Sequence, residues 1–205
     1  ETQNMKKYLS DAILGLGGRD DYFRQILLSF YPNELSILQI GAIEEKKRAW
    51  RHGSGWSDIF FASYIETCGG SLDVVDFDAD HLKNSEALIS DFNIDFSVNL
   101  SEASKFISSM NKSYDIVYLD AGNDPEETKN QYDLLDKESI SLIMVDDEPL
   151  KGTTIEKHEI HEHRSLPFFR GENSIGIYLN KSAFAAKFGN KNKAKEKLLK
   201  DEILI

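Results

Sequence analysis

The sequence predicts an α/β fold built on a doubly wound, mostly parallel sheet with helices on both faces. Three observations support this prediction. Short apolar, β-branched runs recur between residues 35 and 180, and such runs are typical of buried strands. Helix-like segments separate the runs, which indicates right-handed crossovers between parallel strands. Finally, glycine or acidic residues directly follow four of the runs.

Six runs have the length and composition of strands. The first, fourth and fifth are apolar enough to be buried on both faces, as in a parallel sheet. In chain order the predicted strands are 35–41, 72–77, 94–98, 114–119, 140–145 and 174–179.

Helix patterns fill the intervals between these strands. Ser57 or Asp58 can cap a helix that ends at Gly69-Gly70. Further helices are expected over 80–92, 101–107 and from 125 to 135. We therefore expect three parts: an N-terminal helical segment over 1–34, with helices near 8–14 and 22–30, one α/β domain over 35–180, and a Lys-rich, helical tail over 181–205.

The composition of the chain excludes several classes of partner and favours one cellular location. The chain of 205 residues has 35 acidic and 24 basic side chains and a net charge of -11. Such a surface repels phosphate backbones, so nucleic acid is not an expected partner. Apolar runs fall short of the roughly 20 residues that span a bilayer, so no membrane role is expected. The single Cys68 cannot form an internal disulfide, which favours a reducing, cytoplasmic location.

Acidic residues recur at the predicted strand ends. Because ligands bind beyond the carboxyl ends of parallel strands, these residues are expected to meet at one crevice. A single Asp after a strand is commonly a cap or turn residue. Several carboxylates facing one crevice instead require a cation or a polyhydroxylated ligand. The residues concerned are Asp76, Asp78, Asp120, Asp146 and Asp147.

A glycine loop precedes the 57–68 helix. It reads Gly53-Ser54-Gly55-Trp56-Ser57, and glycines there allow a ligand to approach the backbone. The motifs G-x-G-x-x-G and G-x-x-x-x-G-K-[ST] are absent from the sequence, which disfavours nicotinamide and nucleoside-triphosphate enzymes. Asp76, at the end of the second strand, can accept hydrogen bonds from both hydroxyls of a ribose or serve as a turn residue.

The order of these motifs resembles the class I S-adenosylmethionine-dependent methyltransferases. Within that class it is most similar to the metal-dependent small-molecule O-methyltransferases of the catechol and macrolide-sugar type. The resemblance covers roughly 35–180 and implies a Rossmann-like fold, S-adenosylmethionine as cofactor and a divalent cation, Mg²⁺ being favoured. It rests on Leu38-Gln39-Ile40-Gly41, Val74-Val75-Asp76-Phe77-Asp78, Tyr114-Asp115-Ile116-Val117-Tyr118-Leu119-Asp120 and Leu142-Ile143-Met144-Val145-Asp146-Asp147.

The resemblance also implies roles for the cofactor-binding residues. Gly41 and the glycine loop, Gly53, Ser54, Gly55, Trp56 and Ser57, would approach the methionine part, with Asp120 also beside the cofactor. Asp76 would hold the ribose, with Phe77 beside the adenine and Ser101 and Glu102 at its edge. Gln39 stands where the family often has an acid. Residues 43–51 form a longer connection than usual, which indicates either a lid over the cofactor, the favoured interpretation, or a glycine loop that does not bind the cofactor.

Asp120, Asp146 and Asp147 match the metal-holding positions of that branch. Mg²⁺ prefers oxygen ligands, and a hydroxyl bound to it becomes more acidic. The general base is open: it is Asp120 itself or a histidine, with His158 and His161 as the main candidates beside His163. The catechol enzymes place a lysine soon after the aspartate of the fourth strand, whereas this chain has Ala121-Gly122-Asn123-Asp124.

Methylation of a small-molecule hydroxyl, on a sugar or natural-product intermediate, is the predicted function, by an enzyme that could pair as a homodimer. Two alternatives stay open. Asp76-Phe77-Asp78 could hold a cation in a nucleotide-sugar-dependent transferase, or the chain could be a non-catalytic binding module with a methyltransferase-like fold. A zinc site at the histidines is disfavoured because H-E-x-x-H is absent; an exposed polar strand is the favoured interpretation there.

Overall fold

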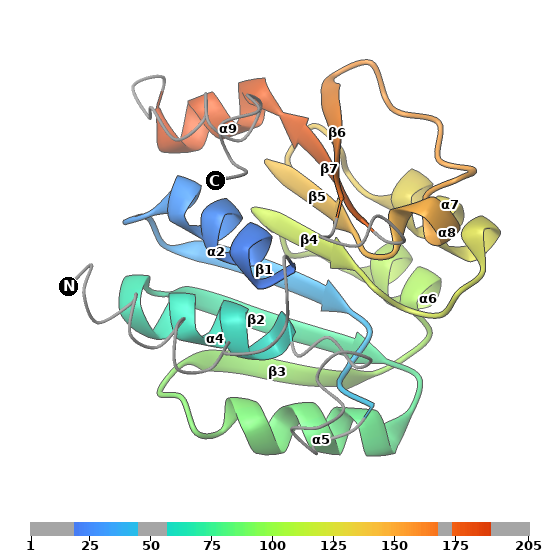
Figure 1. Cartoon of the computed structure of the whole chain (residues 1–205). Coiled ribbons are helices and arrows are strands. Elements are labelled where there is room, and N and C mark those ends of the chain that lie inside the picture. Colours follow the sequence, from blue (N-terminus) through green and yellow to red (C-terminus); the bar gives the residue numbers. More distant parts are fainter. Residues whose placement is uncertain (1–18, 45–56, 168–173, 190–205) are drawn as a thin grey trace.

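The computed structural model describes residues 19–44, 57–167 and 174–189. Within them, the strands form one seven-stranded sheet of order β3-β2-β1-β4-β5-β7-β6 (Figure 1). β1 to β5 are parallel, and β7 is antiparallel to both of its neighbours. The strands are β1 Leu35–Ile40, β2 Gly70–Asp76, β3 Asp95–Leu100, β4 Ile116–Leu119, β5 Leu142–Val145, β6 His161–Pro167 and β7 Ser174–Asn180.

The predicted fold class is confirmed. Each of the six predicted strands is present, with ends that differ by one or two residues. The seventh strand, β6, contains His161 and His163, where the sequence favours a polar strand, and it lies at the edge of the sheet beside β7. Its outward positions are polar because only one face of an antiparallel edge strand needs to be buried.

Helices cover both faces of the sheet (Figure 1). The predicted helix near 8–14 and the tail beyond 189 lie outside the described residues. One core cluster joins a face of the sheet to α2, α4, α5 and α9, and a second joins the other face to α6 and α7. The helices are α2 Arg19–Phe30, α4 Ser57–Cys68, α5 Ala79–Ile89, α6 Ala103–Ser109, α7 Pro125–Leu134, α8 Glu148–Lys151 and α9 Lys181–Phe188.

Aromatic packing fixes α2 on the sheet. The ring of Phe23 lies 5.2 Å from that of Phe60 on α4 and 5.3 Å from that of Tyr118 on β4, the latter edge to face. All three side chains are at least 98% buried, and burial of an aromatic side chain contributes about 2–3 kcal/mol. α2 therefore belongs to the same core as the strands. No helix among the described residues is both long and apolar enough to cross a membrane.

The strand order reverses direction between β1 and β4. The chain runs outward from β1 through β2 to β3, then returns to β4 and β5 on the other side of β1. In open parallel sheets, such a switch point leaves a crevice beyond the carboxyl ends of the two strands, and ligands bind there. The topology thus predicts a ligand site at the residues just after β1 and β4.

Candidate functional site

The residues that follow the parallel strands form one continuous rim. Each of them donates its backbone N–H to a carbonyl on the neighbouring strand, so their relative positions are fixed. The bonds run from Ser101 to Asp76 (3.0 Å), Gly41 to Val75 (2.8 Å), Asp120 to Ile40 (2.8 Å) and Asp146 to Leu119 (3.0 Å). The structure therefore places Asp76, Gly41, Asp120 and Asp146 along one edge of the sheet.

Gly41 marks the switch point. Its φ of +99° lies in the region that glycine alone adopts without strain. A Cβ at this position would lie 2.6 Å from the carbonyl oxygen of Asp120. The absence of a side chain thus allows the ends of β1 and β4 to approach each other closely.

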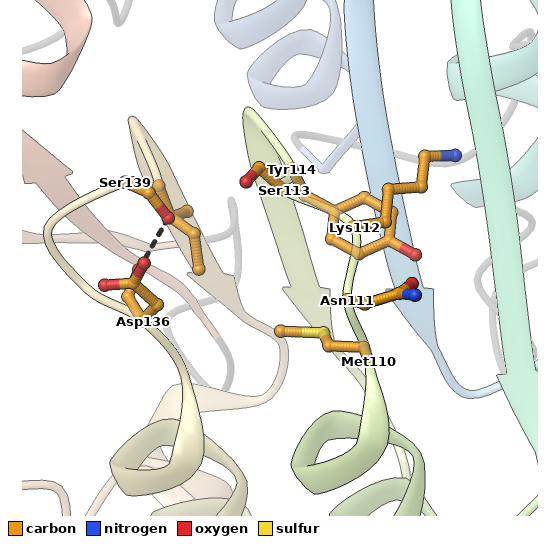
Figure 2. A pocket seen from close by; sticks show the side chains of 8 residues that line it. Met110, Asn111, Lys112, Ser113, Tyr114, Asp136 and Ser139 are labelled. Carbon is orange, nitrogen blue, oxygen red and sulfur yellow. Dashed lines mark hydrogen bonds between the residues drawn. The ribbon is translucent and has the colours of Figure 1, made fainter.

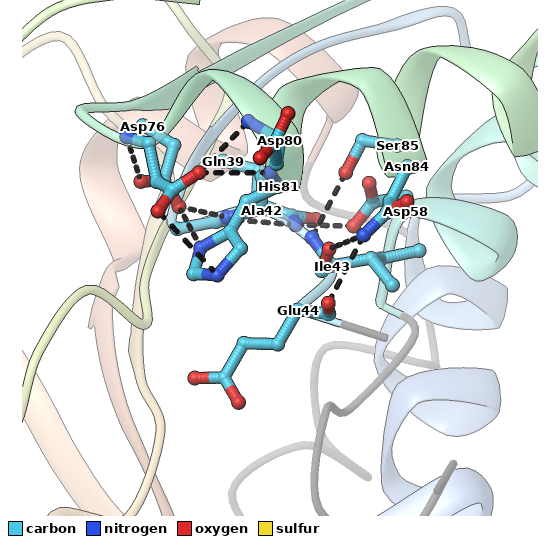
Figure 3. A network of polar contacts seen from close by, with 12 residues as sticks. Gln39, Ala42, Ile43, Glu44, Asp58, Asp76, Asp80, His81, Asn84 and Ser85 are labelled. Carbon is cyan, nitrogen blue, oxygen red and sulfur yellow. Dashed lines mark hydrogen bonds and ion pairs between the residues drawn. The ribbon is translucent and has the colours of Figure 1, made fainter. Parts of the chain in front are cut away.

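Asp76, at the end of β2, has a carboxylate that the chain holds in a fixed orientation. Its Oδ2 accepts the N–H of Ala42 and its Oδ1 accepts the N–H of Asp78, both at 2.8 Å. His81 Nδ1 lies 3.5 Å from the same Oδ2 (Figure 3). A carboxylate offers about four acceptor positions, so each oxygen can accept a further hydrogen bond from a ligand hydroxyl.

The loop that leaves β1 is fastened to α5. Ile43 donates its N–H to Ser85 Oγ at 3.0 Å. Asn84 Nδ2 donates to the carbonyls of Ile43 and Glu44, at 3.2 and 3.0 Å (Figure 3). The chain is thus held beside the rim where it enters residues 45–56. Of the predicted glycine loop, Gly53, Ser54, Gly55 and Trp56 lie outside the described residues.

Gln39 has a buried carboxylate as its partner. Its Nε2 donates to the carbonyl of Gly41 at 2.7 Å and, in a shorter bond, to Asp58 Oδ1. Asp58 lies in the first turn of α4, next to the predicted site residue Ser57, and has no exposed surface. Burial raises the pKa of Asp58 to about 6, although hydrogen bonds from Ser85 and Gln39 partly oppose the rise. Asp58 thus places an acid beside Gln39, where the family pattern has one on β1.

An exposed apolar pair flanks Asp76. The side chain of Phe77, directly after β2, is 70% exposed, and that of Leu100, the last residue of β3, is 65% exposed. Leu100 pairs with Asp76 in the β2–β3 register, and Phe77 follows Asp76 in the chain, so both apolar residues are neighbours of Asp76. Ser101 and Glu102 follow directly, and the side chain of Glu102 makes no capping hydrogen bond to α6. These exposed side chains are available for contact with an apolar or aromatic ligand bound at Asp76.

The three predicted metal ligands lie around a lysine. Lys151 Nζ donates to Asp120 Oδ1 at 2.7 Å and lies 3.8 Å from Asp147 Oδ2. Its side chain is 4% exposed. Burial alone would lower the pKa of Lys151, but the charges of Asp120 and Asp146 outweigh burial and raise it. The ammonium is therefore a fixed positive charge at this rim.

A divalent cation does not fit this arrangement. Mg²⁺ binds oxygen at about 2.1 Å, so an ion ligated by the oxygen of Asp120 that accepts from Lys151 would lie within about 5 Å of the ammonium. Repulsion between the two cations would then cost at least about 6 kcal/mol at an effective dielectric constant of 20. Among residues 19–44, 57–167 and 174–189, no group of three or more His, Cys, Asp or Glu is arranged to hold a metal ion. The structure thus does not support the predicted Mg²⁺.

The structure places His158 and His161 away from Asp120, at the other end of the sheet. His161 pairs with Asn180 at the end of β7, whose neighbour Leu179 pairs with the first residue of β5. Asp120 and Asp146 follow the last residues of β4 and β5. The two histidines are therefore not brought together with Asp120, because β6 is antiparallel to β7, which is antiparallel to β5, so β6 runs in the same direction as β5 and begins at the amino-terminal edge.

His161 has a structural environment. Its Nδ1 lies 2.7 Å from the hydroxyl of Tyr132 on α7, which also accepts the N–H of His158. Burial lowers the pKa of His161 to about 4, and the neighbouring His158 acts in the same direction. A neutral, buried imidazole that is bonded to a tyrosine stabilises the contact between β6 and α7.

Glu148, in the first turn of α8, links the β6–β7 hairpin to the rim. Its carboxylate accepts short hydrogen bonds from Ser165 Oγ and from His163 Nε2, whose side chain is 34% exposed. A Cβ on Gly176 would lie 2.6 Å from this carboxylate. Burial would raise the pKa of Glu148, but the bonds from His163 and Ser165 outweigh it and lower the pKa. Gly176 thus leaves the space through which α8 is fastened to β6 and β7.

A shallow cavity of about 210 Å³ lies away from the rim (Figure 2). Its lining comes from the segment that precedes β4 and the segment that precedes β5, including Lys112, Ser113, Asp136 and Ser139. These segments lie at the amino-terminal ends of the parallel strands. The cavity is therefore distinct from the crevice at the switch point.

The sequence matches no protein-family profile and no curated protein. Solved structures share the fold. Rv0187 from MTB, a cofactor-bound protein, is 15% identical, with a TM-score of 0.55 over 84% of this chain and 86% of that one. A methyltransferase from Geobacter sulfurreducens is 13% identical, with a TM-score of 0.53 over 87% of each chain. The candidate methyltransferase yhhF from Escherichia coli is 16% identical, with a TM-score of 0.58 over 80% of this chain and 85% of that one.

At these identities, the similarity shows a shared methyltransferase-type fold and leaves the activity to be argued from the site. Three site residues were not singled out from the sequence. Lys151 follows Asp147 at the i+4 spacing that brings helical side chains together, which is the signal that could have found it. Asp58 and Glu148 carry no comparable sequence signal, since their partners come from distant segments.

Proposed function

We propose that this protein is an S-adenosylmethionine-dependent methyltransferase. The observation that carries the proposal is the arrangement of Asp76 at the switch point. Its fixed carboxylate has acceptor capacity for the two hydroxyls of a ribose, and the exposed side chains of Phe77 and Leu100 flank it. A nucleoside that placed its ribose on Asp76 would cover these apolar groups with its base. Ser101 and Glu102 follow β3 at the same rim and would contact the edge of that base.

The acceptor in this proposal is a hydroxyl of a small molecule. The sulfonium of the cofactor is positively charged, and the backbones of Gly41 and Asp120 lie next to each other beyond β1 and β4. In this proposal the carboxylate of Asp120 would lie near the reacting groups. A hydroxyl that donates to Asp120 would lose its proton to that carboxylate while its oxygen attacks the methyl carbon. The C–S bond breaks with its electron pair remaining on sulfur, so the products are a methyl ether and S-adenosylhomocysteine. Alignment of the two reactants accounts for much of the rate.

The geometry favours this function over a nucleotide-sugar-dependent transferase. In that alternative, Asp76 and Asp78 would share a cation. Instead, Asp78 caps α5, where its Oδ1 accepts the N–H groups of Asp80 and His81 at 2.8 and 3.2 Å. Asp76 is bonded to Ala42 and to the backbone of Asp78. Hydrogen bonds within the chain therefore explain the Asp-x-Asp pattern.

Calorimetric titration with S-adenosylhomocysteine tests the proposal. The wild-type protein should bind one equivalent, and Asp76→Asn should weaken binding because an amide cannot accept both ribose hydroxyls. Asp95→Asn is the matched control, since Asp95 is exposed at the amino-terminal end of β3, and it should bind as the wild type does. Absence of binding at about 1 mM ligand, where the binding free energy would be weaker than about −4 kcal/mol, would refute the proposal.

A further inference from the structure

The carboxylates of Asp120 and Asp147, beyond β4 and β5, are paired with the ammonium group of Lys151. Lys151, the last residue of α8, has a buried side chain whose Nζ donates to Asp120 Oδ1 at 2.7 Å. The same ammonium lies 3.8 Å from a carboxylate oxygen of Asp147. These carboxylates occupy the positions that the family pattern reserves for metal ligands. The positive charge among them is therefore an amino-acid side chain.

Local structure directs Lys151 back toward the sheet. Asp147 adopts a left-handed conformation, with φ 46°, which turns the chain sharply as it leaves β5. Pro149 then lies in the first turn of α8, a position where its missing N–H is not needed. The carbonyl of Asp147 accepts the N–H of Lys151 at 2.9 Å. This single turn sets residues 147 and 151 on one face and brings the lysine to Asp120.

The anchoring of α8 keeps the lysine in that place. Glu148, in the first turn of α8, is held by Ser165 and His163 of β6. Its methylene groups fit over Gly176 on β7. Glu148 thus ties the first turn of this short helix to β6 and β7, which fixes the backbone from which the side chain of Lys151 extends to Asp120.

We propose that Lys151 takes the place of the divalent cation, so that methyl transfer at this rim is independent of metal. This inference rests on the proposed methyltransferase function. In it, Lys151 is a positioning residue, which holds Asp120 in the orientation that accepts the proton of the acceptor hydroxyl. The reacting bonds are those given above, with the proton on Asp120 and the electron pair on sulfur. It follows that the acceptor does not need two adjacent oxygens, as a metal-chelating diol would have.

Binding of Mn²⁺, followed by electron paramagnetic resonance, tests this inference without an activity assay. The wild-type protein should show no site-specific binding at about 1 mM Mn²⁺. Lys151→Ala removes the competing charge and exposes the carboxylates, so it should bind Mn²⁺ at least about tenfold more tightly than the wild type. Lys151→Arg retains the cation and should behave as the wild type. Lys129→Ala, which removes a partly exposed lysine paired with Asp133, is the matched control and should not gain binding.

Wild-type binding of one Mn²⁺ that is lost in Asp120→Asn would overturn the inference, whether or not Lys151→Ala folds. So would a Lys151→Ala protein that folds and binds Mn²⁺ no better than the wild type. Titration of the same wild-type preparation with S-adenosylhomocysteine, after treatment with EDTA, separates the two proposals. Cofactor binding together with a tight Mn²⁺ site would overturn the role of Lys151 alone, whereas failure of cofactor binding would overturn the methyltransferase function.

Discussion

Replacement of the buried Asp58 by asparagine should change how the stability of the protein depends on pH. Asp58 has no exposed surface, and burial raises the pKa of its carboxyl to about 6, from an ordinary value of 3.8. The folded protein therefore binds a proton on Asp58 between about pH 4 and pH 6 that the unfolded chain releases. As the pH rises through this window, the titration of Asp58 lowers the free energy of unfolding of the wild-type protein, and this decrease is complete above about pH 6.

The size of this loss follows from the shift. A difference of about two pKa units between the folded and unfolded states corresponds to about 3 kcal/mol, at 1.36 kcal/mol per unit. Asparagine does not titrate, and its side-chain oxygen can still accept from Gln39. Relative to the wild type, Asp58→Asn should therefore gain up to about 3 kcal/mol of unfolding free energy between pH 4 and pH 7.

Urea denaturation of both proteins at half-unit pH intervals measures this difference. Subtraction of the wild-type free energy of unfolding from that of the variant cancels the titration of all the other groups. Asp95→Asn, at an exposed position, is the control, and its curve should run parallel to that of the wild type. A difference between Asp58→Asn and the wild type that stays constant from pH 4 to pH 7 would refute the argument, as would one that falls with rising pH.

Three further substitutions probe the rim and the β6 edge. Gly41→Ala places a Cβ 2.6 Å from the carbonyl oxygen of Asp120 at a φ of +99°, so it should lower the free energy of unfolding in urea by more than about 2 kcal/mol; an unchanged midpoint would contradict the close approach. Tyr132→Phe leaves the buried Nδ1 of His161 without its 2.7 Å partner and should cost about 1–3 kcal/mol in the same assay, whereas a cost near zero would show the bond to be unimportant. Phe77→Ala removes a side chain that is 70% exposed, so the melting temperature should stay unchanged while calorimetry shows S-adenosylhomocysteine binding weakened by about three- to tenfold; unchanged affinity would remove Phe77 from the site.

Periodicity and burial made most of the fold predictable from the sequence. The runs at β4 and β5 consist of residues that are buried on both faces, so each appears as a continuous apolar segment that ends at an aspartate. Because the strands are parallel, their ends share one edge, and the predicted convergence of Asp76, Asp120 and Asp146 follows from topology alone. The polar strand favoured for the histidine segment is present as β6, an edge strand whose alternate side chains are less buried, although its first residue, His161, is buried.

The partners of the site residues could not be predicted. Lys151 belongs to a helix of four residues, too short to produce an apolar period, and its contact with Asp120 depends on the left-handed turn at Asp147. His161 shows the complementary error. Its residue type made it a candidate general base, but β6 runs in the same direction as β5, so His161, its first residue, lies at the opposite end of the sheet from Asp120. Strand direction is set by tertiary pairing, which a single sequence does not encode locally.

A crystal structure of the complex with S-adenosylhomocysteine would test the central claim most directly. The account predicts the ribose hydroxyls on the carboxylate of Asp76, the adenine between Phe77 and Leu100, and the sulfur near the junction of Gly41 and Asp120. Ligand density at the amino-terminal ends of β4 and β5, or anywhere else away from Asp76, would contradict it.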